Sequence, residues 1–296
     1  MSKSFTLIEI LVVIVIIGIL SAFIIVSMAG VSSKATIAKG QAFSNSIKNS
    51  LMLNLVSEWR LDDASGTAVS DQWGSNPGAW SGSGGGSYTS PSWRTSSECV
   101  SGGCLAFDGT DDYVNCGNGE SLRNHTFESI FVWASPSAYT ATYRTIVDTG
   151  YWGASYGSLI DTNPSSNSIL IVLKNSAGTA VSETIFYNPN TWIFIGFSWN
   201  GSTVTYYKNG VSSGTPDSFS GTLANNGNNL FIGGRPGNYF FGGLIDDVRI
   251  YNAAIPTSQV QQNYYSGLNR LLSNRGLADK EYLERISQLK EFLVLE

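Results

Sequence analysis

A long apolar segment near the N-terminus constrains this 296-residue chain more than any other feature. From Phe5 to Met28 the residues are apolar, small or hydroxyl-bearing, and Glu9 is the one charged exception. About 20 such residues are enough to cross a bilayer as a helix, which satisfies its own backbone hydrogen bonds in lipid. The segment therefore predicts a membrane-spanning helix.

The flanks of this segment indicate its orientation. Only Met1 to Ser4 precede it, and Lys3 is their single positive charge, which the positive-inside tendency places in the cytoplasm. The remainder of the chain is then expected outside. A cleaved secretory signal is the weaker interpretation, because the apolar run is long and continues into Ser27 to Lys34 without an Ala-x-Ala site.

The start of the apolar segment, Phe5-Thr6-Leu7-Ile8-Glu9-Ile10-Leu11, resembles the prepilin signature of type IV pilins and of type II secretion pseudopilins. The resemblance implies cleavage by a prepilin peptidase between Ser4 and Phe5, and methylation of the new Phe5 amine. It also implies that Glu9 pairs with the N-terminal amine of a neighbouring subunit, which would offset the cost of a buried charge. The alternative for Glu9 is a position at headgroup level.

The chain departs from the family pattern at two points. Ser4 stands where the family usually has glycine, and no proline occurs before Pro77, so the helix is expected to be continuous. Apolar residues recur with helical spacing from Val31 to Val56, which extends the predicted helix. We expect a leader at residues 1–4, a pilin-like transmembrane and assembly helix at 5–56, a globular domain at 57–268 and a helical tail at 269–296.

The globular part has the pattern of an all-β sandwich, with short runs of β-branched and aromatic residues between Gly, Asn, Ser and Asp. Its segments resemble the laminin-G-like (LamG-like), concanavalin A-like jelly roll: 59–63 (WRLDD), 105–114 (LAFDGTDDYV), 204–210 (VTYYKNG) and 241–251 (FGGLIDDVRIY). The expected fold class is thus a long N-terminal helix, an all-β jelly-roll sandwich and a short C-terminal helix. The helical stripe of that tail comprises Leu277, Leu283, Ile286, Leu289 and Leu293.

Composition and motifs argue against two classes of function. The net charge is −5 and no cluster of Lys and Arg is present, so the chain is not expected to bind nucleic acid. The Glu-x-Asp-x-x-Glu run of related β-glucanases is absent, and His125 has no Ser or Cys nucleophile in a recognisable motif. We therefore expect no enzymatic activity and no catalytic residues.

Calcium is the one cofactor for which the sequence offers candidate ligands. Hard oxygen donors lie close together at Asp108, Asp111, Asp112 and Asn115. The favoured alternative is that Asp108 and Asp112 cap a tight turn through backbone amides. In the pair Asp246 and Asp247, strand alternation predicts one inward-facing acceptor rather than a ligand.

Further candidates are aromatic residues in Gly-rich stretches, where exposed rings could stack on sugars: Tyr151, Trp152, Tyr156, Tyr239 and Phe240. Core or loop packing is the alternative for each. Cys99 and Cys104 flank a short loop that a disulfide could close in an oxidising compartment, whereas Cys116 reads as a small buried thiol.

The sequence thus favours a structural subunit of a type IV pilus-like filament that displays a lectin-like head for adhesion or glycan binding. The expected partners are the inner membrane before assembly, prepilin peptidase, further copies of the chain in a helical filament, and glycans or surfaces. The filament would lie outside a prokaryotic cell. A pseudopilin of a secretion or DNA-uptake system is the alternative, and a membrane-tethered glycan-processing enzyme is less favoured.

Overall fold

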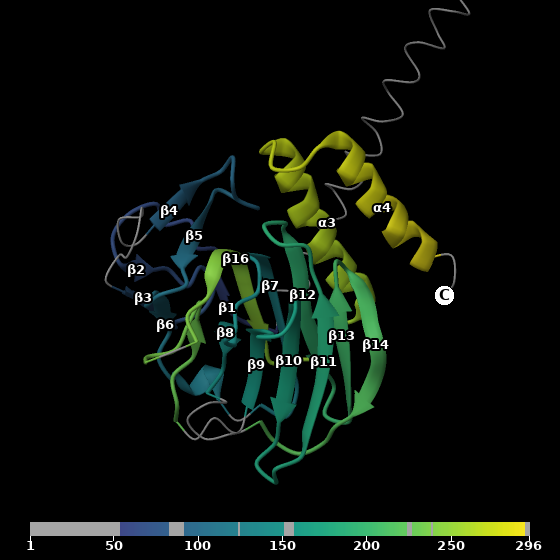
Figure 1. The fold of residues 1–296 in the computed structure, drawn as a ribbon. Helices are drawn as coiled ribbons and strands as arrows, with labels where there is room; N and C mark the ends of the chain where they lie inside the picture. Colours follow the sequence, from purple (N-terminus) through teal and green to yellow (C-terminus); the bar gives the residue numbers. More distant parts are fainter. Residues whose placement is uncertain are drawn as a thin grey trace, which may run out of the picture. The chain divides into compact units, whose positions relative to one another are not determined.

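The structure, a computed structural model, describes residues 54–82, 92–123, 125–150, 157–223, 227–237 and 239–293. The leader, Ser4, Phe5, Glu9 and most of the predicted N-terminal helix lie outside the described residues. Within the described part, no helix is long and apolar enough to span a membrane. The described residues belong to one compact unit, Leu51–Glu296, which we call the head (Figure 1).

Two antiparallel sheets form the head. The first sheet has the order β14 (Val211–Ser218), β13 (Thr203–Lys208), β12 (Ile193–Trp199), β7 (Glu128–Pro136), β16 (Gly242–Tyr251), β5 (Gly103–Asp108) and β4 (Ser92–Thr95), and β1 (Leu55–Trp59) also pairs with β16. The second sheet has the order β11 (Ala180–Phe186), β10 (Ser168–Lys174), β9 (Gly157–Thr162), β8 (Arg144–Asp148), β15 (Phe231–Ile232), β6 (Tyr113–Asn115), β3 (Gly78–Ser81) and β2 (Ala68–Val69). A short 3-10 helix, η1, spans Glu120–Leu122.

The main core lies between the inner faces of the two sheets. Alternation along each strand supplies it, so that Ile169, Ile171 and Leu173 of β10 face Ile193, Ile195 and Phe197 of β12 within one buried cluster. Large aromatic side chains such as Trp59 and Trp199 are fully buried there. This arrangement is the β-sandwich that the sequence predicts.

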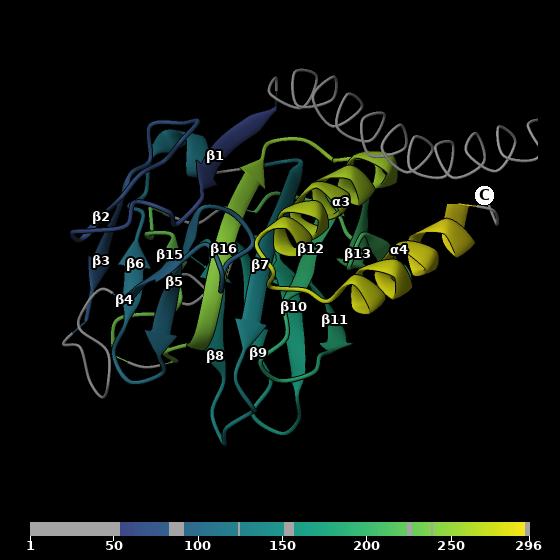
Figure 2. The same ribbon diagram turned by 90° about the horizontal axis from the view of Figure 1, so that it is seen from above.

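Two helices cover the outer face of the first sheet, as the two views in Figures 1 and 2 show together. Helix α3 (Thr257–Ser273) places Tyr264 against Trp133 of β7, with ring centroids 5.5 Å apart. Gly267 follows one turn later and lies directly over Trp133, because a Cβ there would approach the indole ring to 2.6 Å. Helix α4 (Asp279–Leu293) adds the buried Leu289 to this second apolar cluster.

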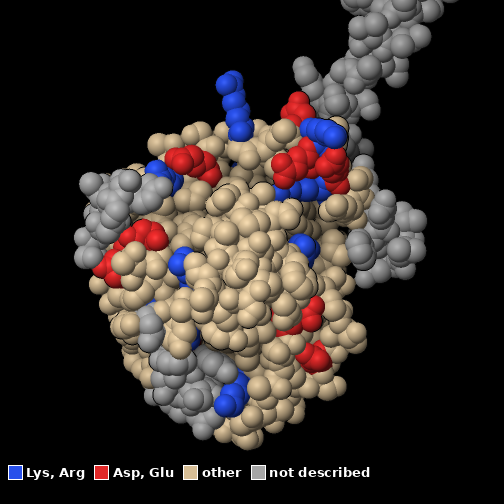
Figure 3. All heavy atoms as spheres, viewed as in Figure 1, with Lys and Arg blue, Asp and Glu red and all other residues tan. Residues whose placement is uncertain are grey.

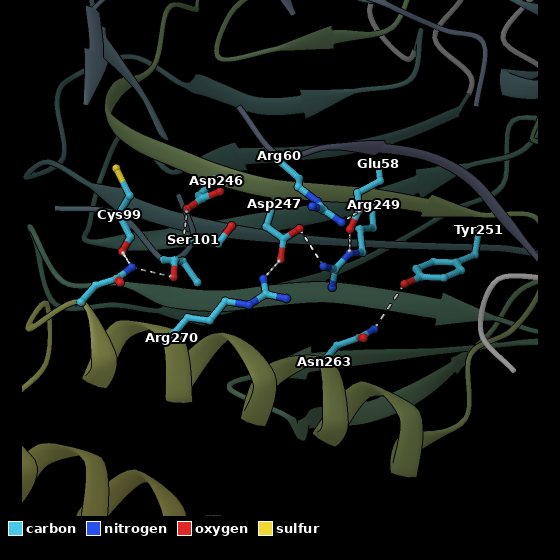
Figure 4. A network of polar contacts seen from close by, with 12 residues as sticks. Glu58, Arg60, Cys99, Ser101, Asp246, Asp247, Arg249, Tyr251, Asn263 and Arg270 are labelled. Atoms are coloured by element: carbon cyan, nitrogen blue, oxygen red, sulfur yellow. Dashed lines mark hydrogen bonds and ion pairs between the residues drawn. The ribbon is translucent and has the colours of Figure 1, made fainter. Parts of the chain in front are cut away.

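A buried polar network fastens β1 and α3 to β16 (Figure 4). Arg249 of β16 pairs with Glu58 of β1 at 2.9 Å and with Asp247 at 2.8 Å, and Arg270 of α3 reaches Asp247 at 3.5 Å. Each buried charge therefore has an opposite charge beside it, as a low-dielectric interior requires. The network explains how the strand that begins the head is held in the centre of the first sheet.

Both Asp246 and Asp247 are buried, and the pairing of Asp247 with Arg270 of α3 shows that the covering helix contributes to this burial. The pairing of β16 with β7 shifts register between Asp246 and Arg249, and Asp247 has φ +54°, which breaks the alternation. Asp246 accepts a hydrogen bond from the Ser101 amide at 2.9 Å. Burial raises the pKa of Asp246 well above its usual range.

Three predicted boundaries and positions need correction. Leu55 and Val56 open strand β1 and do not continue a helix, because they pair with the buried end of β16. The C-terminal region holds two helices, and α3 runs continuously through the predicted boundary at 268. Leu283 is 65% exposed, so it does not belong to the buried stripe that includes Leu289.

Candidate functional site

The outer face of the second sheet carries a pocket of about 350 Å³. Strand pairing positions its residues: Phe231 of β15 lies opposite Asp148 of β8 and Asn115 of β6, with all three side chains on the face away from the core. The described residues that line the pocket are Asp148, Gly150, Gly227, Asn228, Asn229, Phe231, Arg235 and Pro236. They combine one aromatic ring, two amides, one carboxylate and one guanidinium.

Arg235 lines the pocket and is only 3% exposed. Its Nη1 lies 3.2 Å from Asp148 Oδ2 and its Nη2 lies 3.1 Å from Asp161 Oδ2, so one guanidinium joins β8 and β9. The Tyr239 ring stacks on it, 4.4 Å from guanidinium carbon to ring centroid. Gly233, with φ +78°, permits the sharp turn that directs Arg235 back over the sheet.

Burial and ion pairing together set the electrostatics of this cluster. Burial raises the pKa of Asp161 to about 7, against the attraction of Arg235. Near neutral pH, Asp161 therefore exchanges a proton. Asp148 is held in the same cluster, because its Oδ1 accepts a hydrogen bond from the Gly150 amide at 2.8 Å and its Oδ2 lies beside Arg235.

A ridge of half-buried aromatic rings adjoins the pocket. Tyr113 packs edge-on against Phe231, with ring centroids 5.8 Å apart, and stacks on Phe240 at 6.4 Å. The predicted aromatic candidates Tyr239 and Phe240 thus lie together at this site, and each is partly exposed. Tyr151, Trp152 and Tyr156 lie outside the described residues, in the segment that follows Gly150.

The two ends of that segment are held by a buried polar chain. Thr149 and Ser158 exchange backbone and hydroxyl hydrogen bonds, and the Ser158 hydroxyl donates to Glu128 at 2.9 Å. Glu128 also contacts His125 Nδ1 at 2.8 Å. Burial opposes protonation of His125, but the hydrogen bond and charge of Glu128 together with the Ser121 carbonyl outweigh it and raise the pKa of the imidazole. His125 therefore acts within a structural network.

The predicted calcium ligands Asp108, Asp111 and Asp112 do come together, with one carboxylate oxygen of each within 4.8 Å of the others. Asp112 Oδ2 accepts from the Asp108 amide at 3.0 Å, and Asp108 Oδ1 accepts from the Thr110 amide at 2.7 Å. These are the turn-capping bonds of the alternative interpretation. Burial raises the pKa of Asp112 to about 6.

Two further observations bear on a calcium ion at this cluster. The Arg144 guanidinium lies beside Gly109 and is attracted by Asp108, so a cation of the chain already compensates part of the acidic charge. Asn115 directs its amide oxygen to the Gly117 amide at 2.9 Å. The carboxylate oxygens are the type of ligand that calcium prefers, but their hydrogen bonds are those of a capped turn. Calcium binding at this cluster stays a prediction.

The cysteines take structural positions. Cys99 and Cys104 form a disulfide, with a Cα–Cα distance of 5.4 Å, beneath the C-terminal end of α3. Cys116 is a buried free thiol, and burial raises its pKa well above the usual range. Neither feature contributes a reactive group to the pocket.

Sequence reasoning did not identify Arg235, Asp148 or Asp161. Arg235 belongs to the run Gly233-Gly-Arg-Pro-Gly237, which reads as a turn, and the two aspartates lie in apolar strands far from it in the sequence. A charged residue at an alternate position of an otherwise apolar strand was the available signal, because strand burial penalises an unpaired charge. The residue that pairs with such a charge could not be identified without knowledge of how the strands pair.

Comparisons with known proteins agree with this architecture. The model of the family described as the concanavalin A-like lectin/glucanases superfamily matches residues 108–261, just over half of the chain. The model of the prokaryotic N-terminal methylation motif, the type IV pilin signature, matches residues 1–25. No curated protein sequence matches the chain.

Solved structures with the same fold include binding domains of clostridial toxins. The binding domain of Paraclostridial Mosquitocidal Protein 1 aligns with a TM-score of 0.58 at 16% identity over 74% of this chain and 53% of its own. The botulinum neurotoxin serotype D binding domain aligns with a TM-score of 0.54 at 12% identity, again over 74% and 53%. A serotype D domain in complex with N-acetylneuraminic acid aligns with a TM-score of 0.53 at 13% identity over 74% and 52%. The chain spans about half the length of these toxin chains, and the likeness concerns the fold.

Proposed function

Because the chain belongs to the concanavalin A-like lectin/glucanases superfamily and carries a prokaryotic N-terminal methylation motif, we propose that it is a subunit of a type IV pilus-like surface filament whose head binds glycans. The observation that carries the proposal is the presence of both features in one chain. The methylation motif supplies a means of assembly and display, and the superfamily supplies a lectin-like sandwich.

The filament part rests on the N-terminal residues. Cleavage before Phe5 would expose an amine that Glu9 of an adjacent copy can neutralise inside the filament core. The apolar residues to Met28 would hold the precursor in the inner membrane and then pack against other copies. Prepilin peptidase and further copies of the chain are the partners that this process requires.

The binding part rests on the pocket of the second sheet. Sugar sites combine an aromatic ring that packs on the sugar face with carboxylate and amide groups that fix the hydroxyls. Phe231, Asp148, Asn228 and Asn229 supply this combination within one pocket. The relative with bound N-acetylneuraminic acid indicates only that the fold can serve sugar recognition.

Binding is favoured over catalysis by the position of the carboxylates. Glycoside hydrolysis needs two carboxylates that face the scissile bond. Of the two aspartates held by Arg235, Asp148 lines the pocket and Asp161 does not. Among the residues that the structure describes, the pocket lining therefore lacks the pair of carboxylates that hydrolysis needs, which favours a lectin role.

The proposal is tested on filaments sheared from cells that express the chain. Electron microscopy and mass spectrometry of the subunit should find filaments of this chain that begin at N-methylated Phe5. A Glu9→Val variant should be processed but assemble poorly. Recovery of the chain only from membranes, with Met1 to Ser4 intact, would contradict the filament role.

A further inference from the structure

The turn between β12 and β13 carries the triplet 200–202 (NGS), which has the Asn-x-Ser form of an acceptor for N-linked glycans. A second triplet of this kind lies at 124–126 (NHT). We propose that Asn200 is an attachment site for an N-linked glycan, and that the folded head is the acceptor, so that Asn124 is left unmodified. The proposal goes beyond the proposed function and needs from it only the position of the head outside the cytoplasm.

The two residues that define the triplet 200–202 are accessible on the folded head. The triplet connects the end of β12 to the start of β13. Its middle residue, Gly201, has φ +84°, which glycine adopts without strain. Asn200 and Ser202 on either side of it are both exposed. A transferase can therefore reach the amide and the hydroxyl without unfolding a strand.

The hydrogen bonds of this turn leave the amide nitrogen of Asn200 available. Asn200 Oδ1 accepts from the Ser202 amide at 3.1 Å, from the Thr203 amide at 2.8 Å and from the Ser202 hydroxyl at 2.9 Å. Backbone amides only donate, so the side-chain atom that faces them is the oxygen, and Nδ2 faces away from them. Within the described part of the chain, Nδ2 has no hydrogen-bond partner.

The attachment is a glycosyl transfer from a lipid-linked oligosaccharide diphosphate, catalysed by a membrane-bound transferase of the cell. Asn200 Nδ2 forms a bond to the anomeric carbon of the first sugar, and the bond from that carbon to the phosphate oxygen breaks. The electron pair of the broken bond leaves with the lipid diphosphate, and the amide nitrogen gives one proton to a base of the transferase. No group is oxidised or reduced.

The second triplet, 124–126, is anchored in the folded head through its middle residue. His125 is 9% exposed, and its ring nitrogens contact Glu128 at 2.8 Å and the Ser121 carbonyl oxygen at 2.9 Å. Its own carbonyl oxygen accepts from the Leu223 amide at 3.1 Å. A transferase that binds all three residues of a triplet would have to break these contacts. The folded head therefore favours modification of the triplet in the β12–β13 turn.

A glycan at Asn200 would cover apolar surface and add hydration. Phe127 is 48% exposed, and a Cβ at Gly201 would lie 3.1 Å from its ring, so an exposed ring on which a sugar can pack borders the turn. The head also has few charges: charged residues make up 13% of the chain, and uncharged side chains form most of the described surface in Figure 3. An attached glycan supplies the hydration that charged side chains supply on other surfaces.

The test is mass spectrometry of the full-length chain purified from the cells that naturally make it. Trypsin cleaves after Lys and Arg, so the peptide 175–208 carries Asn200 and the peptide 124–144 carries Asn124. We expect a sugar-containing mass on the first peptide in most copies, located at Asn200 by fragmentation that preserves the glycan. The second peptide should be unmodified in most copies.

Matched variants made in the same cells identify the linkage. Ser202→Ala should abolish the modification because it removes the hydroxyl of the motif, and Ser202→Thr should keep it because it retains a hydroxyl. Asn200→Asp keeps an oxygen for the three hydrogen bonds of the turn but has no amide nitrogen, so it should also be unmodified. Asn124→Gln is the control and should leave the glycan on Asn200 unchanged.

The contrary outcomes are distinct from one another. An unmodified Asn200, or one changed only by deamidation, would overturn the proposal. A glycan that persists in Asn200→Asp would be attached through a hydroxyl and would also overturn it. Equal modification of both triplets would overturn the claim that the folded head is the acceptor. None of these outcomes concerns filament assembly or binding by the pocket, so the proposed function fails or stands separately.

Discussion

Replacement of Arg235 by methionine should destabilise the head, because it leaves two buried carboxylates without their positively charged partner. Methionine keeps the length of the side chain but removes the charge that pairs with Asp148 at 3.2 Å and Asp161 at 3.1 Å. Removing one partner of a buried ion pair typically costs about 3 to 5 kcal/mol. We expect about 3 kcal/mol at pH 8, because Asp161 can lower the cost by taking up a proton.

The pH dependence follows from Asp161. Its folded-state pKa, about 7, lies above the ordinary value of 3.8, so its contribution to stability is fully present below pH 4 and is lost as the pH rises through 7. Without Arg235 the pKa rises further, and this loss grows. The difference in unfolding free energy between Arg235→Met and the unchanged protein should therefore be larger at pH 8 than at pH 5.

The assay is urea unfolding of the full-length protein in detergent, followed by tryptophan fluorescence at pH 5 and pH 8. Lys280→Met is the control, because its pair with Glu284 spans 3.7 Å between side chains that are 90% and 60% exposed. That change should cost about 0.5 kcal/mol or less. A loss for Arg235→Met below about 1 kcal/mol at pH 8, or equal losses at both pH values, would refute the reasoning.

Three further changes test other parts of the account. Gly267→Ala should destabilise by about 1 to 2 kcal/mol in urea unfolding, since contact of its Cβ with Trp133 at 2.6 Å outweighs the gain in helix propensity of roughly 1 kcal/mol; a stabilised variant would contradict the packing of α3. Reduction of the Cys99–Cys104 disulfide should lower the unfolding free energy by about 2 kcal/mol, and an unchanged midpoint would count against this bond. Asp161→Asn should flatten the fall in stability between pH 5 and pH 8, and an unaltered pH profile would assign that fall to other groups.

The sequence predicts central strands better than edge strands. Residues 168–174 and 203–208, rich in β-branched and aromatic side chains, form β10 and β13, and Asn209-Gly210 after β13 forms a tight turn with φ +51° and +79°. Strand β14 has the sequence VSSGTPDS, which carries no apolar alternation. As the edge strand of its sheet it can hold Pro216, and its pairing with β13 shifts register nearby.

The site could be predicted only in part for a related reason. Tyr239 and Phe240 were recognisable as loop aromatics, and both lie beside the pocket. In the pairing of β8 with β9, which shifts register between Thr145 and Val147, Asp161 lies opposite Thr145 and Asp148 opposite Leu159, and Arg235 joins the two carboxylates. Local residue patterns do not encode such a shift, so long-range pairing decided which charges came together.

The most direct test of the account is adhesion of purified filaments to beads coated with a panel of glycans. Filaments of the unchanged chain should retain the beads, and filaments of Phe231→Ala, assembled in equal amount and beginning at the same methylated Phe5, should release them. Equal retention by both kinds of filament would contradict the central claim that the head of an assembled subunit binds glycans through this pocket.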